Sequence, residues 1–157
     1  MRTVIIGGVA GGMSAATRLR RLDEEREILV FERGAYVSFA NCGLPYYVGG
    51  VIPERASLLL QTPESLAARF RLDVRVRHEV VGIDAGAKTV AVRDLDAGTV
   101  DTVVYDDLVI AAGAGAAPGG TDGGVPSSTL RSVEDVDRIM ALLAGAPDPH
   151  AVVVGAG

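Results

Sequence analysis

The only cysteine of this 157-residue chain, Cys42, lies in a segment whose residue types favour a reactive thiol. Gly43 gives backbone access behind the thiol, and Pro45 is placed to occupy the first turn of a helix. A cysteine just before a helix lies near the positive end of the helix dipole, which favours the thiolate. The alternative is a buried cysteine that packs as a small apolar side chain. This segment alone leaves the two interpretations equally open.

Residues 1–34 have the pattern of a βαβ unit that binds a nucleotide. A short apolar run at 3–6 suits a buried parallel strand, and it leads directly into the glycine-rich run 7–12. A helical pattern follows over 13–22, and a second apolar strand over 28–31. In such a unit the glycines let the backbone approach a pyrophosphate, whose charge the helix N-terminus stabilises. The order of these elements is more specific than the glycine run alone, for which a purely structural turn is the alternative.

An acidic residue, Glu32, ends the second strand twenty residues beyond Gly12. This is the spacing at which such units place the acid that accepts hydrogen bonds from the ribose hydroxyls. Val9 stands where the middle glycine of a G-x-G-x-x-G motif would lie. The approach of a pyrophosphate is therefore expected to be tighter at that point.

The chain resembles the N-terminal part of the coenzyme A-disulfide reductases, which are flavin-dependent pyridine nucleotide-disulfide oxidoreductases. The most specific feature is the run Ser-Phe-Ala-Asn-Cys-Gly-Leu-Pro-Tyr-Tyr over 38–47. The matching stretches are 4–16, 31–34, 38–47, 62–64, 78–81 and 107–111. The resemblance implies that the βαβ unit binds FAD rather than NAD, and that Cys42 faces the flavin. The glycine motif by itself does not distinguish the two dinucleotides.

The resemblance also implies which residues hold the cofactor. These residues are Gly7, Gly8, Val9, Ala10, Gly11, Gly12, Glu32, Arg33, Val81, Ala112 and Gly113. One of them departs from the family, which has an alanine-threonine-glycine turn near the dinucleotide. Ala112 replaces the threonine of this turn and so removes a hydroxyl.

A second cysteine, which most disulfide reductases of this general type carry, is absent from the sequence. Tyr47 occupies the position where a C-x-x-x-x-C pair would place it. To store two electrons, Cys42 must therefore pair with an external thiol or be oxidised to a sulfenic acid. The first route predicts a mixed disulfide with a small thiol such as coenzyme A. The second route predicts an NADH oxidase or peroxidase.

Two arginines on the predicted helix 13–22 favour a phosphorylated thiol as the partner. Ser14, Arg18 and Arg21 are spaced by four and three residues, so they share one helix face. Arginine side chains suit phosphate oxygens. By resemblance, these three residues, together with Ser38 and Asn41, match positions that bind coenzyme A. The alternative is a solvated basic face neutralised by nearby acidic residues.

A further basic residue is expected downstream by resemblance, but Phe70 stands in that position. Arg69 or Arg71 could take its place, and the sequence leaves the choice between them open.

The remaining pattern predicts an α/β fold in which a Rossmann-like parallel sheet carries a three-strand antiparallel meander. Thr62 is the predicted N-cap, and Pro63 a first-turn residue, of a helix that ends at Phe70. We expect strands over 73–77, 78–83, 89–94, 99–105, 108–111 and 151–154, turns at 84–86 and 96–98, a loop over 114–128, and a helix over 132–143 capped by Ser132. His78 and His150 are expected in a strand and a loop rather than in catalysis.

Composition argues against several classes of partner. The net charge of −5 argues against a nucleic-acid partner, and the arginines are local features. No stretch approaches the roughly 20 apolar residues of a membrane span. The sequence shows no metal-ligand cluster, and a single free thiol is typical of a reducing cytoplasm.

Residues 151–157 repeat the pattern of an apolar strand that enters a glycine turn, and they resemble the opening of a second dinucleotide unit for NAD(P)H. We therefore expect residues 1–113 to form the first part of an FAD-binding domain. Residues 114–147 would be a loop and a connecting helix, and residues 148–157 the start of an NAD(P)H-binding domain. The chain is then expected to be an N-terminal fragment, inactive alone, of an enzyme that is a homodimer when intact.

These expectations predict the N-terminal FAD-binding portion of a cytoplasmic flavoprotein with two dinucleotide domains, most simply a coenzyme A-disulfide reductase. The resemblance implies that NAD(P)H reduces FAD, and that reduced flavin reduces a mixed disulfide between Cys42 and coenzyme A. The alternatives within the family are an NADH oxidase or peroxidase and a coenzyme A-persulfide reductase. The alternative from another class is a non-catalytic nucleotide-binding module.

Overall fold

A computed structural model describes residues 1–115, 125–147 and 150–154 of the chain. The strands are β1 (Arg2–Ile6), β2 (Glu27–Phe31), β3 (Asp73–Arg75), β4 (His78–Asp84), β5 (Thr89–Asp94), β6 (Val100–Val104) and β7 (Asp107–Ile110). The helices are α1 (Ala10–Leu22), α2 (Leu44–Val48), α3 (Pro63–Phe70) and α4 (Val133–Ala144), with two 3-10 turns, η1 (Asn41–Gly43) and η2 (Arg55–Leu58).

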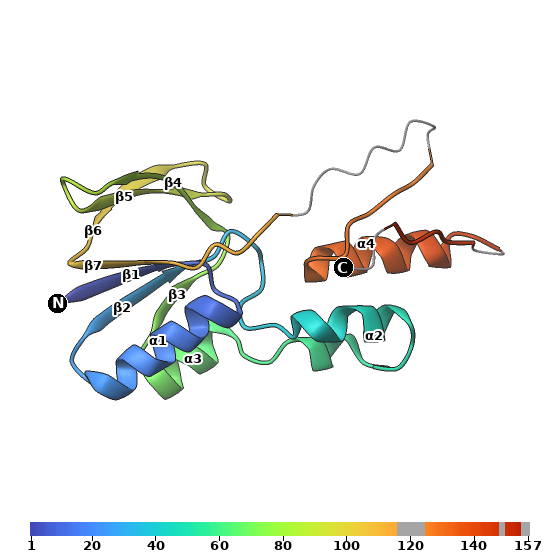
Figure 1. Ribbon diagram of the computed structural model, residues 1–157, viewed down its shortest axis with the longest axis horizontal. Helices are drawn as coiled ribbons and strands as arrows, with labels where there is room; N and C mark the ends of the chain where they lie inside the picture. Colours follow the sequence, from blue (N-terminus) through green and yellow to red (C-terminus); the bar gives the residue numbers. More distant parts are fainter. Residues whose placement is uncertain (116–124, 148–149, 155–157) are drawn as a thin grey trace.

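The structure is layered, as Figure 1 shows. A parallel sheet of four strands in the order β3-β2-β1-β7 forms the middle layer. Helices α1 and α3 cover one face of this sheet, and the antiparallel sheet β4-β5-β6 covers the other. Helices α2 and α4 pack together at one end of the layers. The predicted α/β fold with a three-strand meander is therefore confirmed.

The register of the parallel sheet brings three strand ends to one edge. Ile6, the last residue of β1, lies opposite Phe31 of β2 and Ile110 of β7. Because the strands are parallel, the loops that follow them leave the sheet on the same side. In open α/β sheets this carboxyl edge is where ligands bind. The glycine run, Glu32 and the segment after β7 therefore meet at one place.

Alternation along the buried strands supplies a core on each face of the parallel sheet. Val4 and Leu29 point toward the antiparallel sheet, whereas their neighbours Ile5 and Val30 point toward the helices. All four side chains are buried. The layer under the helices contains Ile5, Met13, Ala16, Ile28, Val30, Val37, Leu66, Leu72 and Val74, and the layer under the meander contains Val4, Leu29, Phe31, Val90, Val92 and Tyr105.

Helix α4 and the segment around α2 share a third apolar cluster. Its buried members are Leu44, Leu58, Val133 and Val136. The predicted N-cap of α4 is confirmed, because the Ser132 side chain accepts a hydrogen bond from the backbone N–H of the residue at N3. The predicted cap and first-turn proline of α3 are confirmed in the same way.

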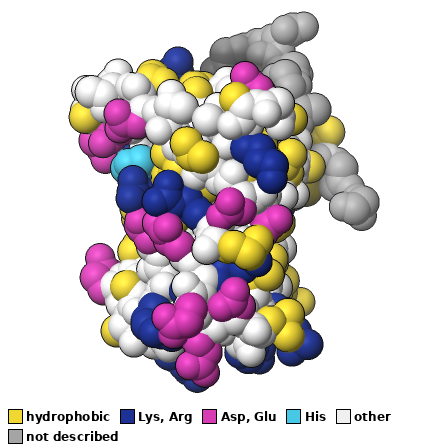
Figure 2. Space-filling model, turned by 90° about the vertical axis from the view of Figure 1, so that its left-hand side faces the viewer, with side chains coloured by type: hydrophobic (Ala, Val, Ile, Leu, Met, Phe, Trp, Pro, Cys, Tyr) yellow, Lys and Arg dark blue, Asp and Glu magenta, His cyan; other side chains and the backbone are white. Residues whose placement is uncertain are grey.

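Charged side chains of both signs lie on the surface of the described residues. On the face shown in Figure 2, acidic and basic side chains are interspersed. Several of them form ion pairs, such as Arg26 with Asp107 at 2.6 Å. Within the described residues, no helix has the length and apolar character needed to cross a membrane.

Two predicted boundaries are wrong by two or more residues, and one predicted strand is absent. Helix α1 begins at Ala10 rather than at 13, because the first-turn glycines take part in the helix. Strand β3 ends at Arg75 rather than at 77, since Arg77 adopts a left-handed conformation with φ of 59° and turns the chain into β4. The predicted buried strand at 151–154 is absent: these residues form no strand, and Val152, Val153 and Val154 are at least 87% exposed. Residues 116–124 of the predicted loop and the glycine turn at 155–157 lie outside the described residues.

Arg20 is a buried charge that holds two helix ends together. It is 9% exposed, and its guanidinium donates to four backbone carbonyl oxygens. The acceptors are Asp23 and Glu24, just after α1, and Phe70 and Arg71, at the end of α3, at distances of 2.6 to 3.2 Å. The last carbonyls of a helix lack partners within it and carry partial negative charge, so a buried cation between two such ends satisfies both.

We predict that Arg20→Ala lowers the free energy of unfolding by about 3 kcal/mol, because it removes a buried guanidinium that donates hydrogen bonds to four carbonyl oxygens. Arg21→Ala is the matched control. Arg21 is exposed on the same helix, and its loss should change the free energy of unfolding by less than about 0.5 kcal/mol. Urea unfolding followed by circular dichroism measures both variants. Equal stability of the two variants would contradict this role of Arg20.

Candidate functional site

The glycine run packs closely against the segment that follows β7. The backbone N–H of Gly7 donates to Phe31 at 2.8 Å, and the N–H of Ala111 donates to Ile6 at the same distance. Gly7 has φ of +104°, and a Cβ at this position would overlap the Ala111 carbonyl. Only glycine satisfies both requirements. The predicted cofactor residues Ala112 and Gly113 therefore lie beside the start of the glycine run.

The first turn of α1 lies directly over the same loop. A Cβ on Gly12 would overlap the carbonyl oxygen of Gly7, so the loop and the helix can meet only without a side chain there. Val9 occupies the N-cap position and provides no side-chain hydrogen bond to the helix. The first turn also contains no acidic residue. The N-terminal N–H groups of α1, unlike those of α3 and α4, are thus left without a side-chain cap, an arrangement that suits an anion.

Glu32 bridges the loops that follow β1 and β2. One of its carboxylate oxygens accepts a hydrogen bond from the N–H of Gly8, and the other accepts one from Gly34, both at 2.7 Å. A carboxylate oxygen can accept more than one hydrogen bond, so both oxygens retain capacity for hydroxyl donors. Glu32 therefore fixes the shape of the loop and remains able to bind a ribose.

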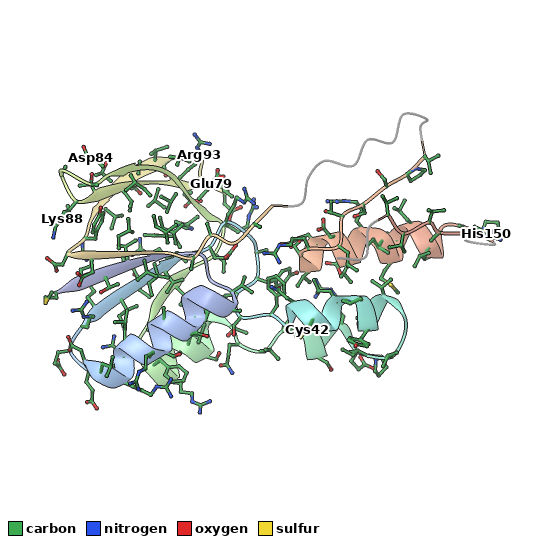
Figure 3. The ribbon with its side chains drawn as sticks, in the orientation of Figure 1. Cys42, Glu79, Asp84, Lys88, Arg93 and His150 are labelled. Atoms are coloured by element: carbon green, nitrogen blue, oxygen red, sulfur yellow. The ribbon has the colours of Figure 1, made fainter. Side chains whose placement is uncertain are left out.

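Arg33 and Val81 lie farther along this edge, toward the antiparallel sheet. The Arg33 guanidinium is 3.7 Å from one carboxylate oxygen of Glu79, and the Arg93 guanidinium is 3.8 Å from the other. Figure 3 shows Glu79 and Arg93 close together on neighbouring strands. Val81 lies two residues beyond Glu79, at a bulge in β4. The Arg33 side chain is 74% exposed, which leaves it accessible to a ligand.

Cys42 is exposed, so the alternative of a buried apolar cysteine is wrong. It is the middle residue of η1, immediately before α2, and Figure 3 shows it beside that helix. Pro45 lies in the first turn of α2, as predicted. Because α2 has only five residues, it supplies a smaller dipole than the sequence interpretation assumed. Exposure of the thiol is the stronger structural argument for reactivity.

Asn41, next to the thiol, has a polar atom without a partner. Its Oδ1 is buried and accepts no hydrogen bond from any described residue. Buried side-chain oxygens nearly always accept at least one hydrogen bond. A donor from a bound molecule would satisfy this oxygen, which agrees with the predicted place of Asn41 in the substrate site.

A groove of about 320 Å³ between α1 and α3 brings two predicted substrate residues together. Ser14 and Ser38 both line it, with Arg69 on the opposite side. Ser38 has φ of 51°, which is uncommon for a residue with a side chain, and its N–H donates to the Gly8 carbonyl at 2.8 Å. The groove is thus connected through Ser38 to the glycine loop.

The structure does not bring all the predicted substrate residues into this groove. Arg18 and Arg21 are exposed on α1, and neither lines it. Arg71 is directed elsewhere, because its guanidinium donates to the Glu24 carbonyl at 2.7 Å. Of the two arginines that the sequence left open, Arg69 is therefore the one in the groove.

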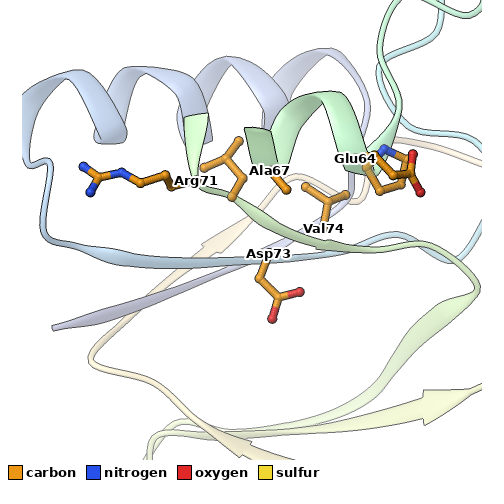
Figure 4. A pocket seen from close by; sticks show the side chains of 7 residues that line it. Glu64, Ala67, Arg71, Asp73 and Val74 are labelled. Carbon is orange, nitrogen blue, oxygen red and sulfur yellow. The ribbon is translucent and has the colours of Figure 1, made fainter. Parts of the chain in front are cut away.

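A larger hollow of about 520 Å³ lies beside the edge strand β3, between this strand and α3. Figure 4 shows Arg71 and Glu64 at its two ends. Of the cofactor and substrate residues that the sequence suggests, its lining contains only Arg71, one of the two alternatives for the basic residue expected at position 70. The smaller groove, next to Ser38 and the glycine loop, is the better candidate site.

Comparison with known proteins agrees with this geometry. The family described as "Pyridine nucleotide-disulphide oxidoreductase" matches residues 1–157. The coenzyme A disulfide reductase of Staphylococcus epidermidis is 38% identical over 156 residues, which are 99% of this chain and 35% of that protein. The chain therefore spans about a third of the length of the curated relatives that it matches.

Two solved structures show the same fold. The structure of reduced Bacillus anthracis CoADR-RHD superposes with a TM-score of 0.83 at 47% identity, over 91% of this chain and 26% of that one. A NAD-dependent persulfide reductase from A. fulgidus superposes with a TM-score of 0.85 at 37% identity, over 92% of this chain and 27% of that one.

Proposed function

Because this chain belongs to the pyridine nucleotide-disulphide oxidoreductase family, we propose that it carries the FAD and thiol sites of a coenzyme A-disulfide reductase. The observation that supports this most directly is the single exposed thiol of Cys42 on a segment bonded to the glycine loop through Ser38. A lone thiol in this place suits a mixed disulfide with an external thiol. The coenzyme A disulfide reductases of Staphylococcus, which match almost the whole chain, support the choice of thiol.

The residues at the carboxyl edge fit FAD. The uncapped N-terminus of α1 and the close contact of Gly7 with Gly12 leave backbone N–H groups open to a pyrophosphate. Glu32 is placed to accept hydrogen bonds from ribose hydroxyls, and Arg33 lies exposed beside it. When bound, FAD would supply the two-electron chemistry that reduces a disulfide, with NAD(P)H as the source of electrons.

The thiol step is a disulfide exchange. The thiolate of Cys42 attacks one sulfur of coenzyme A disulfide, the sulfur–sulfur bond of the substrate breaks, and one coenzyme A thiolate leaves. The Cys42 proton passes to solvent, and the product is a mixed disulfide between Cys42 and coenzyme A. Asn41 would accept a hydrogen bond from the substrate through its buried Oδ1.

The phosphates of coenzyme A would lie along the groove and the exposed face of α1. Ser14, Ser38 and Arg69 line the groove, and Arg18 and Arg21 extend a basic surface along the same helix. Guanidinium groups hydrogen-bond phosphate oxygens in a bidentate manner. We propose that the groove holds the part of the substrate nearest Arg69, and that the two helix arginines meet its remaining charge.

A coenzyme A-persulfide reductase is the second candidate, and the persulfide reductase from A. fulgidus favours it. With a persulfide substrate, attack by Cys42 would release hydrosulfide and form the same mixed disulfide. The two functions therefore share the thiol and differ in the leaving group.

Our first prediction for this function concerns Cys42. Incubation of the reduced protein with coenzyme A disulfide should add one coenzyme A moiety per chain, visible by intact-mass analysis and reversed by reductant. Coenzyme A persulfide should give the same adduct with release of hydrosulfide. Cys42→Ser should show no adduct. An adduct that remains on Cys42→Ser would refute the proposed role of the thiol, and oxidation of Cys42 to a sulfenic acid without any adduct would favour an NADH oxidase or peroxidase.

The second concerns Glu32. Glu32→Ala removes the acceptor for two ribose hydroxyls, a loss on the order of 1.5–3 kcal/mol for charge-assisted hydrogen bonds. FAD affinity, measured by calorimetry, should therefore fall roughly tenfold or more. Glu134→Ala is a control, because within the described part of the chain that carboxylate accepts a hydrogen bond from the Ala35 N–H, at 3.1 Å, and not from the glycine loop. Unchanged FAD affinity in Glu32→Ala would mean that another residue holds the ribose.

The third distinguishes the two arginines around Phe70. Arg69→Ala should weaken binding of coenzyme A about tenfold, because it removes a charged donor from the groove. Arg71→Ala is the matched control and should leave the affinity for coenzyme A within about twofold, since the Arg71 guanidinium donates a hydrogen bond to the Glu24 carbonyl. Calorimetric titration with coenzyme A measures both. A larger loss in Arg71→Ala would assign the phosphate contact to that residue instead.

A further inference from the structure

An ion pair far from the groove joins α4 to the 3-10 turn η2. The Nε and Nη2 atoms of Arg55 donate to the two carboxylate oxygens of Asp137 at 2.6 and 2.7 Å. Nη2 also donates to the hydroxyl of Tyr36 at 2.9 Å, and the guanidinium carbon lies 5.1 Å from the centre of the Tyr36 ring. Hydrogen bonding by Arg55 lowers the pKa of the Asp137 carboxyl. One guanidinium on η2 thus contacts two other segments, α4 and the loop that contains Tyr36.

The segment that follows Arg55 holds the thiol and the groove in one arrangement. Its backbone runs along residues 38–40: the N–H of Ala40 donates to the Leu58 carbonyl at 2.9 Å, and the N–H of Leu60 donates to the Ser38 carbonyl at 3.3 Å. Ser38 lines the groove, and Ala40 accepts the hydrogen bond that closes the Cys42 turn, from the Gly43 N–H at 2.9 Å. Residues 55–60, which we call the strap, therefore set the distance between the thiol and the groove.

The strap also contacts the Cys42 turn through its side chains. Leu58 is fully buried, and its Cδ2 would lie 3.1 Å from a Cβ built on Gly43. Leu58 belongs to the same apolar cluster as Val133 and Val136 of α4. Apolar contacts hold α4 against the strap but allow small shifts along it, whereas a bidentate pair of Arg55 with Asp137 fixes one relative position.

We propose that Arg55 and Asp137 are positioning residues that fix the strap, and through it align the Cys42 thiol with the groove that binds the phosphorylated part of the substrate. The proposal rests on the proposed function, because it assumes that Cys42 exchanges with coenzyme A disulfide. In this exchange one sulfur–sulfur bond forms as another breaks, so it requires no further oxidant or reductant. Loss of the pair should affect a substrate that uses both the thiol and the groove more than one that uses the thiol alone.

The experiment compares two disulfides on the reduced full chain. Rates of mixed-disulfide formation at Cys42 are measured with coenzyme A disulfide and with 2-hydroxyethyl disulfide, which is small and uncharged. The ratio of the two rates cancels general changes in thiol reactivity. We expect this ratio to fall about tenfold in Asp137→Asn and in Arg55→Lys, because a small misplacement of reacting groups lowers a reaction rate by at least such a factor. In the double variant the ratio should fall no further than in either single variant, because the two residues act as one pair.

Arg138→Gln is the matched control on the same helix. Its guanidinium contacts Asp135 and Ser128 rather than the strap, so the ratio should stay within about twofold of the unsubstituted chain. Thermal unfolding of each variant checks that the chain is folded at the assay temperature. If Asp137→Asn is unfolded, the more conservative Arg55→Lys decides the result.

Two results would overturn the inference. One is an unchanged ratio in both folded variants, and the other is an equal loss of rate with the two disulfides, which is the effect of a merely structural role. A ratio near one in the unsubstituted chain has a different meaning: the groove would then confer no preference for coenzyme A disulfide. That outcome would refute the proposed substrate, and the inference with it.

Discussion

The contact on which the rest of the site depends is the one between the Gly7 carbonyl and the first turn of α1. It requires that Gly12 carry no side chain and that Gly7 adopt a positive φ beside Ala111. Both conditions follow from the parallel register that ends β1, β2 and β7 at one edge. Once the loop is closed in this way, the Gly8 N–H reaches Glu32 and the Gly8 carbonyl reaches the N–H of Ser38. The dinucleotide loop and the thiol segment are therefore positioned by the same turn.

Much of the fold could be predicted from the sequence because its signals are local. The parallel strands are short apolar runs, the meander has a turn every few residues, and Thr62 and Ser132 mark helix starts by their own side chains. Signals that depend on distant partners were missed. Arg20 follows the same helical pattern as the exposed arginines near it, and its burial depends on carbonyls fifty residues away at the end of α3. The apolar run at 151–154 satisfies the pattern of a strand, but a strand also needs a neighbour.

The candidate site shows the same division. Cys42 and Glu32 could be proposed as site residues from the sequence, because a motif and a spacing mark them. The choice between Arg69 and Arg71 could not be made, since it depends on where α3 ends: Arg71 has left-handed φ and turns its side chain toward α1. The pair of Arg55 with Asp137 joins residues 82 positions apart, and no pattern in either segment indicates it.

Two kinds of constraint hold the two halves of the site. At the dinucleotide loop the constraint is steric, because a single added Cβ would overlap a backbone carbonyl and the close packing would be lost. At the thiol segment it is a set of hydrogen bonds and one bidentate ion pair between partly exposed groups, which fix position by direction and distance rather than by overlap. A partly exposed ion pair contributes little to stability, roughly 0–1 kcal/mol, so the main effect expected of the Arg55–Asp137 pair is on position rather than on folding. This difference suits the proposed chemistry: a bound dinucleotide needs a close-fitting cradle, whereas an exposed thiol that exchanges disulfides must be aligned with its substrate and remain accessible to it.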